Sequence, residues 1–202
     1  MGINRNKAIV GALLALGLAG AGGAAVAASG TVTDEAELRE MRAVEGAGVT
    51  LADIVREAEA RSGGRVVEAG AEDETGGVVF IVEAMKADGS VEELRYGLDG
   101  TFSASQPMDA EDADEAAPIV SAKLTLAEGI DKAIAETGGV ALEAEYGSED
   151  GKLVIEAETV DGDQLTEVAI DADTGAILEV ETDGGMDDDG DDDGAEDEAP
   201  RG

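Results

Sequence analysis

The sequence predicts an α+β protein built from two tandem small domains, each with one helix packed on a three- to four-stranded antiparallel sheet. Two observations lead to this prediction. A segment with helical spacing at residues 49–64 recurs, nearly unchanged, at residues 124–139. Each copy is followed by short stretches of alternating apolar and polar residues, separated by Asp-Gly turns. Helical and then strand periodicity, repeated once, is typical of two copies of one supersecondary unit.

Both helical segments carry start and stop signals. Thr50 with Asp53, and Thr125 with Glu128, have the spacing of a capping box, in which the threonine oxygen accepts a backbone N–H and the acid reaches back. Each segment ends at a glycine pair, and glycine readily takes the left-handed conformation that closes a helix. The apolar residues between these signals form one narrow stripe that needs cover, namely Leu51, Val55 and Ala58 in the first copy and Leu126, Ile130, Ala133 and Ile134 in the second.

The stretches after each helix have the two-residue period of strands. Asp150-Gly151 and Asp161-Gly162 provide tight turns in the second copy, as Asp88-Gly89 and Asp99-Gly100 do in the first. We expect one face of each sheet to be apolar and to cover the helix stripe. The other face is expected to direct its acids toward water, among them Glu156, Glu158 and Glu167.

The amino terminus predicts export. Arg5 and Lys7 precede an uncharged apolar run from Ala8 to about Ala28, which ends at the small-x-small site Ala25-Val26-Ala27. This is the pattern of a secretory signal peptide cleaved before Ala28 or Ser29. The alternative is an uncleaved signal anchor, since the run is about long enough to span a bilayer. The expected location is therefore periplasmic, cell-envelope or extracellular.

The remaining segments complete the predicted organisation. A spacer or added helix is expected because Leu38 and Met41 are one helical turn apart, and the linker and tail are expected because they are acidic and lack apolar periodicity. The predicted order is a signal peptide at 1–28, a spacer or short helix at 31–47, domain 1 at 48–103, an acidic linker at 104–121, domain 2 at 122–181 and a disordered acidic tail at 182–202.

Composition excludes several kinds of site. The chain has no cysteine and no histidine, which removes disulfides, thiolate metal sites, cysteine nucleophiles and the commonest general base. Only two Tyr, two Phe and no Trp are present, so the core is expected to consist of small aliphatic residues. No constellation suggests catalysis, and the sequence predicts neither an enzyme, nor catalytic or metal-ligating residues, nor a cofactor.

The formal net charge of −35 restricts the partners. Nucleic acid and anionic membrane surfaces repel such a polyanion. Cationic partners, divalent cations or a salty medium remain compatible with it. In the tail, Asp189, Asp191, Asp193 and Gly194 match the start of a calcium loop, but Pro200 occupies the position that requires a bidentate Glu. We therefore expect weak attraction of divalent cations there and no tight site.

The two repeats resemble the PepSY domain family. The resemblance rests on LTLAEGIDKAI (124–134), IDADTGAILEV (170–180) and, in the first copy, VTLADIVREAEA (49–60); the first copy departs at its end, where LDGTFSAS replaces the Thr-Gly turn. The resemblance implies an exported or membrane-attached protein that inhibits or regulates peptidases.

Two functions follow from these expectations. The first is an exported non-enzymatic binding module, with an extracytoplasmic protease or another envelope protein as its partner, contacted through a sheet edge or face. The alternative is an acidic, calcium-buffering envelope or surface protein in which the linker and tail bind cations.

Overall fold

The computed structural model describes residues 35–108, 118–149 and 151–183. One helix, α1 (Glu35–Glu45), precedes the repeats. The first repeat contains α2 (Leu51–Ser62), β1 (Arg65–Glu74), β2 (Gly77–Met85), β3 (Val91–Tyr96) and β4 (Phe102–Pro107). The second contains α4 (Leu126–Thr137), β5 (Val140–Glu149), β6 (Lys152–Asp161), β7 (Gln164–Asp171) and β8 (Ile177–Asp183). The expected α+β class, with one helix and a meander in each repeat, is confirmed.

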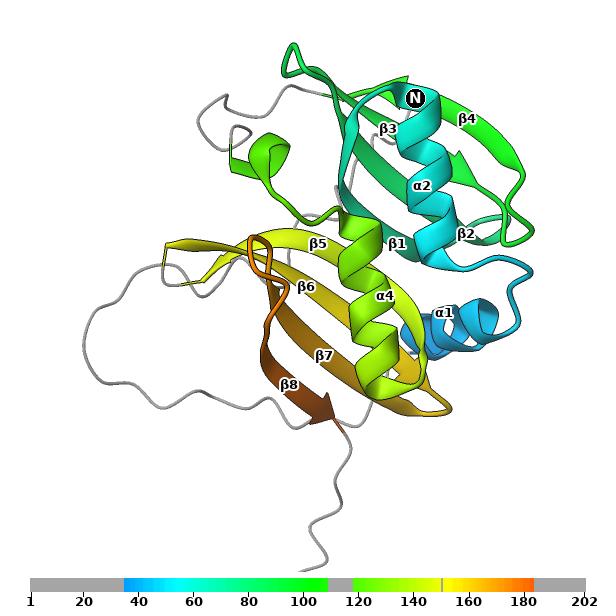
Figure 1. Cartoon of the computed structure of the whole chain (residues 1–202). Helices are drawn as coiled ribbons and strands as arrows, with labels where there is room; N and C mark the ends of the chain where they lie inside the picture. Colours follow the sequence, from blue (N-terminus) through cyan, green and yellow to red (C-terminus); the bar gives the residue numbers. More distant parts are fainter. Residues whose placement is uncertain (1–34, 109–117, 150, 184–202) are drawn as a thin grey trace, which may run out of the picture.

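The two meanders form one sheet. Its eight strands run in the order β4-β3-β2-β1-β5-β6-β7-β8, and every neighbouring pair is antiparallel. The joint is the pair β1–β5, which brings the first strand of each repeat to the centre of the sheet (Figure 1). The expectation of two separate tandem domains is therefore not confirmed, because each repeat completes its sheet with the other.

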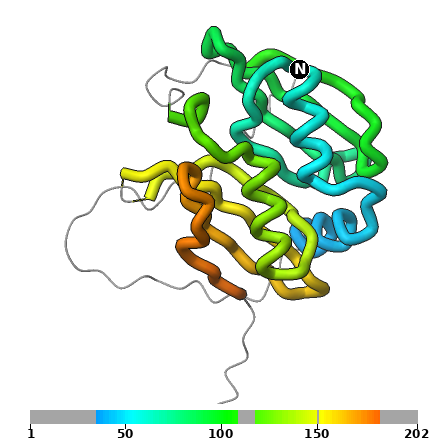
Figure 2. The backbone as a smooth tube through the Cα atoms, in the orientation of Figure 1, coloured from blue at the N-terminus to red at the C-terminus, as the bar shows by residue number. Residues whose placement is uncertain are grey.

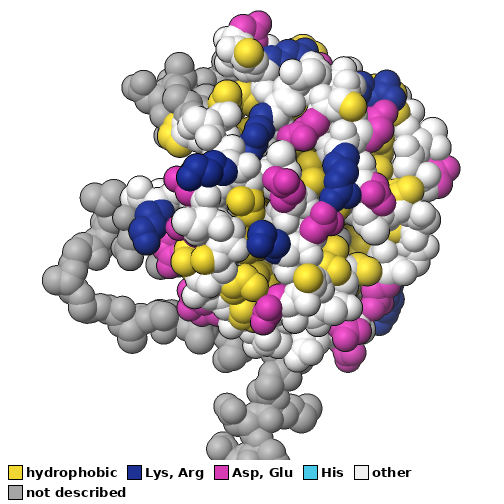
Figure 3. Space-filling view, in the orientation of Figure 1, with side chains coloured by type: hydrophobic (Ala, Val, Ile, Leu, Met, Phe, Trp, Pro, Cys, Tyr) yellow, Lys and Arg dark blue, Asp and Glu magenta, His cyan; other side chains and the backbone are white. Residues whose placement is uncertain are grey.

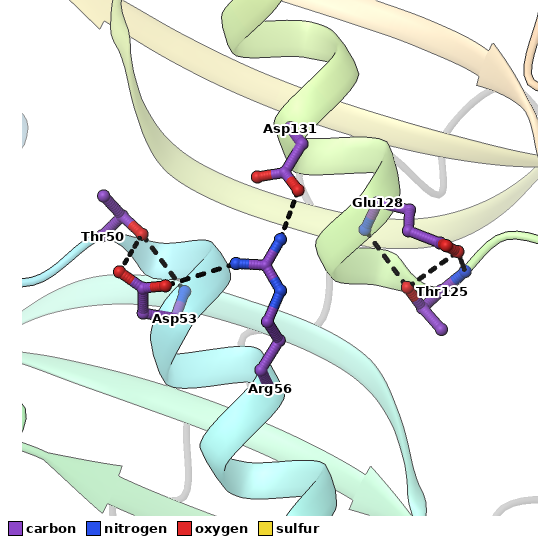
Figure 4. Close-up of polar contacts among 6 residues, drawn as sticks. All are labelled: Thr50, Asp53, Arg56, Thr125, Glu128 and Asp131. Carbon is purple, nitrogen blue, oxygen red and sulfur yellow. Dashed lines mark hydrogen bonds and ion pairs between the residues drawn. The ribbon is translucent and has the colours of Figure 1, made fainter.

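The joint has approximate two-fold symmetry. Ala69 on β1 lies opposite Ala144 on β5, and these residues occupy the same position in their repeats, 75 residues apart in the sequence. On the helix side of the joint, Arg56 of α2 forms an ion pair with Asp131 of α4, and these two residues also occupy the same position in their repeats (Figure 4). A residue that meets its own counterpart marks the position of a two-fold axis. The repeats are thus arranged like the two subunits of a symmetric dimer.

The helix ends confirm the predicted caps. Thr125 Oγ1 accepts the Glu128 N–H at 3.2 Å and the Glu128 carboxylate accepts the Thr125 N–H at 2.8 Å, so the capping box is complete (Figure 4). In the first repeat Thr50 Oγ1 accepts the Asp53 N–H at 3.2 Å, but the Asp53 carboxylate accepts from Thr50 Oγ1 and not from the Thr50 N–H, so only half of the predicted box is formed. Gly63 and Gly138 close the helices with φ values of 66° and 81°, the left-handed conformation that favours glycine.

The two repeat helices lie side by side on one face of the sheet and share one core (Figures 1 and 2). The aliphatic stripe of each helix is buried in this core, as the helical spacing predicts, except that Ile134 of α4 is only partly buried. The same cluster continues across the β1–β5 joint through Ala69 and Ala144. A single hydrophobic core therefore runs through both repeats.

Different groups fill the two ends of the joint. At one end, α1 buries Met41 and Val44 in the core, and Glu40 Oε1 accepts the Asp73 N–H of β1 at 2.7 Å. At the other, the Arg65 guanidinium donates to Tyr146 Oη at 2.9 Å and to the backbone oxygens of Ala122 and Leu124. The segment expected as a spacer or short helix thus includes a helix that packs on the core.

The predicted boundary between domain 1 and the linker is wrong by several residues. The linker was expected from residue 104, but β4 runs to Pro107 and pairs with β3 along its length. Proline is tolerated there because β4 is an edge strand that needs no donor on its outer side. At the linker's other end, residues 118–121 form a short helical segment and Ala122 is buried. The expected signal peptide at 1–28 and nearly all of the expected disordered tail at 182–202 lie outside the described residues.

Candidate functional site

The sheet face opposite α2 and α4 carries rows of glutamates that cross the strands. Successive side chains of a strand point to opposite faces, so residues adjacent to core positions such as Ala69, Ala144 and Ile155 lie on this face. The register aligns them across strands. One row is Glu93, Glu83, Glu68, Glu145 and Glu156, and the other is Glu143, Glu158, Glu167 and Glu181; together we call them the glutamate face.

Directly opposed like charges destabilise a sheet. The glutamate face nevertheless places Glu68 between Glu83 and Glu145, and Glu158 between Glu143 and Glu167. At the β3 end of this face, Arg95 forms ion pairs with Glu74 and Glu93. The register therefore gathers many carboxyl groups on one face of the sheet.

Two of these glutamates hold their protons unusually strongly. Burial, followed by the charges of Glu83 and Glu145, raises the pKa of Glu68 to about 9. Burial, followed by the charge of Glu158, raises the pKa of Glu143 to about 8. Burial also raises the pKa values of Glu72, Glu145 and Glu156. A low-dielectric environment and neighbouring negative charge both disfavour the ionised form.

These carboxyl groups correct the expectation that the acids of this face point freely into water. Glu68 is only 9% exposed and Glu83 only 8%. Glu68 Oε1 is buried without a hydrogen-bond partner among the described residues. Glu156, Glu158 and Glu167 are half-buried as well. Alternation predicts which face a residue occupies, but the depth to which its neighbours bury it depends on the assembled sheet.

A shallow hollow lies where the glutamate face approaches β8. It is lined by Glu158, Leu165, Glu167 and Glu181, and its volume is about 60 Å³. Small-molecule sites usually occupy several hundred cubic ångströms. The hollow is therefore too small for a metabolite, although its carboxylates would attract the tip of a cationic side chain.

The outer strand β8 combines free backbone groups with exposed aliphatic side chains. Ile177 is 39% exposed, and Leu178 and Val180 are each 44% exposed. The helix side of the molecule, which contains Val180, shows apolar side chains at its surface among charges of both signs (Figure 3). Exposed aliphatic residues on an edge strand are characteristic of interaction sites.

The opposite edge of the sheet has a different character. Strand β4 ends in Ser103, Ala104, Ser105, Gln106 and Pro107, all of which are exposed. Short polar side chains and a terminal proline protect an edge strand from pairing with other chains. Two edges that occupy equivalent positions in their repeats therefore differ in their suitability for pairing, and β8 is the more suitable one. The sequence signal for this is the apolar run Ala176-Ile177-Leu178.

Residues 171–175 form a turn that is held by the Asp171 side chain. Asp171 Oδ1 accepts the N–H groups of Asp173 at 3.0 Å and Thr174 at 2.7 Å. The bonds from Thr174 lower the pKa of Asp171. The candidate calcium-loop residues Asp189, Asp191 and Asp193 lie outside the described residues.

The described residues bear on three kinds of feature: a metal site, a phosphate-binding loop and a membrane-spanning helix. Within residues 35–108, 118–149 and 151–183, no group of three or more acidic side chains is arranged to hold a metal ion. The glycine pairs at 63–64 and 138–139 close helices, so their N–H groups do not form a phosphate-binding loop. A helix long and apolar enough to cross a bilayer is likewise absent from the described part of the chain.

Comparison with known proteins identifies one part of the chain. Residues 123–181 match the family model described as peptidase propeptide and YPEB domain, PepSY. None of the curated proteins matches the chain. A crystal structure of a candidate lipoprotein from Clostridium difficile 630 aligns with a TM-score of 0.42 and 14% identity, over 67% of this chain and 94% of that one.

The family match and the fold agree on the limits of one unit. The matched residues contain α4, β5 to β7 and most of β8, and the first repeat lies outside them. The expected resemblance is thus confirmed for the second repeat and is not shown by the family model for the first. The comparisons support one PepSY domain, at residues 123–181.

Proposed function

We propose that this protein is an exported, non-enzymatic PepSY-type binding module that regulates an extracytoplasmic peptidase. The observation that carries the proposal is the match of residues 123–181 to the peptidase propeptide and YPEB domain family. PepSY domains are generally propeptide or regulatory modules, and the matched unit is a complete helix-and-meander structure. A domain of this kind acts by contact with its partner.

The chemistry of the surface supports a binding role. The described residues combine a glutamate face with an aliphatic edge strand, and both are features that other proteins can recognise. Histidine and cysteine, the residues that most often act as base or nucleophile in hydrolases, do not occur in the sequence. The raised pKa values of Glu68 and Glu143 follow from their burial in the sheet and from the neighbouring glutamates, so they do not require a catalytic role.

Export is the second component of the proposal. It rests on the amino-terminal signal pattern, with Arg5 and Lys7 before an apolar run and a small-x-small site at Ala25-Val26-Ala27. The family of the second repeat is consistent with a location outside the cytoplasm. We propose that the processed protein meets its peptidase in the periplasm, in the cell envelope or outside the cell.

The test combines capture with activity. The processed chain, expressed with a carboxy-terminal affinity tag, is incubated with the exported fraction of the producing cells, and bound proteins are identified by mass spectrometry. Casein hydrolysis by the same fraction is measured as the processed chain is titrated in. We expect a peptidase to be retained saturably and its activity to change along the same binding curve.

A matched acidic control separates specific from charge-driven capture. A chain in which the order of residues 35–183 is scrambled has the same composition and charge but no sheet, so it is immobilised in parallel. Retention of the same peptidase by both forms, or no change in hydrolysis at saturating protein, would contradict the proposed function.

A further inference from the structure

We propose that strand β8 binds an extended segment of the partner protein by strand addition, and that this segment alternates apolar with basic side chains. Strand addition uses the free N–H and C=O groups of a sheet edge for affinity and alternate side chains for specificity. This inference rests on the proposed function in one respect only, namely that the partner is a peptidase. The choice of edge and the chemistry of the segment come from β8 itself.

The first step concerns the edge. Strand β8 pairs with β7 on one side and ends the sheet on the other (Figures 1 and 2). It runs for seven residues, long enough for several backbone hydrogen bonds with an added strand. Natural edges are usually protected by charge, proline or shortness, as β4 is by Pro107. The aliphatic residues Leu178 and Val180 leave β8 without that protection on its helix side.

The second step concerns the side chains of the added strand. Val180 lies opposite the core residue Val168, so it faces the helix side, whereas Glu181 lies opposite Glu167 on the glutamate face. Directly opposed residues on neighbouring strands are in contact. A partner residue beside Val180 is therefore best apolar, and its neighbours in the segment, beside Glu179 and Glu181, are best basic.

The third step is the hollow next to β8. Glu158, Glu167 and Glu181 line it, and they lie in one row that runs inward from the edge. A Lys or Arg side chain placed beside Glu181 extends toward this hollow, where the carboxylates surround its charge. Charge-assisted contacts of this kind are shorter and stronger than neutral ones. The glutamate row thus favours a basic residue at that position.

Charge also argues against a second copy of this chain as the occupant. Pairing β8 with β8 of another copy would bring Glu179 and Glu181 of both copies to one edge-to-edge contact. Like charges on facing strands are destabilising, and a net charge of −35 adds long-range repulsion. A basic, apolar segment from a different protein removes both penalties.

The test uses defined peptides and the full processed chain. The probe is a fluorescent peptide of alternating valine and lysine with the length of β8. One control peptide alternates valine and glutamate, and another is the valine-lysine peptide with N-methyl groups on alternate nitrogens, which blocks one hydrogen-bonding edge. Binding is measured by anisotropy in enough NaCl to screen the general attraction of a polyanion. We expect the unmodified valine-lysine peptide to bind tightest.

Three variants locate the binding site. Val180→Lys and Glu181→Gln change β8, and Ser105→Lys changes the opposite edge β4; each raises the net charge by one. We expect the two β8 variants to weaken binding of the valine-lysine peptide by roughly fivefold or more, and Ser105→Lys to leave it unchanged. Circular dichroism verifies that each variant is folded. If Val180→Lys does not fold, the exposed Glu181→Gln still tests the inference.

Four outcomes would overturn the inference. Equal weakening by Ser105→Lys would show general charge attraction, and undiminished binding of the N-methylated peptide would exclude strand addition. Sedimentation that shows a dimer, converted to monomer by Val180→Lys, would make a second copy the occupant. A peptidase captured equally by native and Val180→Lys protein would sink this inference and leave the proposed function intact. Binding of the valine-lysine peptide at β8, with no peptidase captured from the exported fraction, would contradict the proposed function and leave this inference intact.

Discussion

Glu68 lies at the joint between the two repeats, with Glu83 beside it on β2 and Glu145 on β5. Burial and these two charges raise its pKa to about 9. Between about pH 4.5 and pH 9 the folded protein therefore keeps a proton that an unfolded glutamate has released. The stabilising contribution of this group is fully present below the unfolded pKa and is lost as the pH rises through the folded pKa.

Replacing this carboxyl group with an amide gives the first prediction. We expect Glu68→Gln to flatten the decline in unfolding free energy between about pH 5 and pH 9, and to stabilise the protein near pH 9, where the buried carboxyl group of the native protein begins to ionise. Urea unfolding at several pH values and constant high salt measures this effect. The exposed Glu136→Gln, at the end of α4, serves as control and should leave the slope unchanged. An unaltered slope in Glu68→Gln would refute the prediction.

At the scale of the elements, α4 packs closely on the sheet at a glycine in the middle of the helix. Gly129 lies inside this helix, where its counterpart in α2 is the buried Ile54. A Cβ at position 129 would lie 2.7 Å from Cγ2 of Ile155, a fully buried side chain of β6. The absence of a side chain therefore lets α4 settle onto β6, although glycine is a poor helix former.

The second prediction sets helix propensity against packing. Alanine favours a helix interior over glycine by about 1 kcal/mol, but overpacking a core costs about 1–3 kcal/mol. Because Ile155 has no room to move, we expect Gly129→Ala to lower the unfolding free energy by about 1 kcal/mol in chemical denaturation. Adding Ile155→Val should recover part of this loss. A net gain in stability from Gly129→Ala alone would show that α4 can lift without penalty.

The elements that the sequence predicts are those with local causes. Thr50, Thr125 and the glycine pairs begin and end the helices through contacts within a few residues, and the Asp-Gly turns set the hairpins in the same way. The pairing of β1 with β5 has no such local signal. It joins residues 75 positions apart, and the alternation of either strand is equally compatible with a free edge.

The candidate site was predictable only in part, for the same reason. Alternation assigns Glu156, Glu158 and Glu167 to the face away from the helices, and the register confirms that face. Their alignment into rows depends on pairing between strands, and the burial of Glu68 depends on the β1–β5 joint. The exposure of Leu178 depends on β8 being the last strand, which only the strand order of the whole sheet determines.

At the scale of the whole molecule, the joint makes the two repeats depend on each other. If β1 and β5 separated, each would become an edge strand with unpaired backbone groups, and the core at Ala69 and Ala144 would be opened to water. The Arg56–Asp131 ion pair and the contacts of Arg65 with the second repeat would also be lost. Partial unfolding of one repeat thus removes interactions that the other needs.

The third prediction follows from this dependence and uses a matched pair of core residues. Leu51 and Leu126 begin the two repeat helices at equivalent positions, and both are fully buried. We expect Leu51→Ala and Leu126→Ala each to lower the unfolding free energy of the whole protein by about 2–5 kcal/mol. Each variant should show one cooperative transition in urea by circular dichroism. Each should also show one thermal transition, with the same melting temperature by circular dichroism and by calorimetry.

Hydrogen exchange separates this expectation from two independent domains. In a single cooperative unit, Leu51→Ala accelerates exchange of the most protected amides in β6 as much as those in β2, because both open only in global unfolding. Independent repeats would confine the acceleration to the mutated half and would split the urea transition in two. The exposed Leu178→Ala on β8 is the control, since it removes the same atoms outside the core and should change neither measurement appreciably. Equal acceleration across the β1–β5 joint would therefore identify that strand pair as the contact that makes two repeats one folding unit.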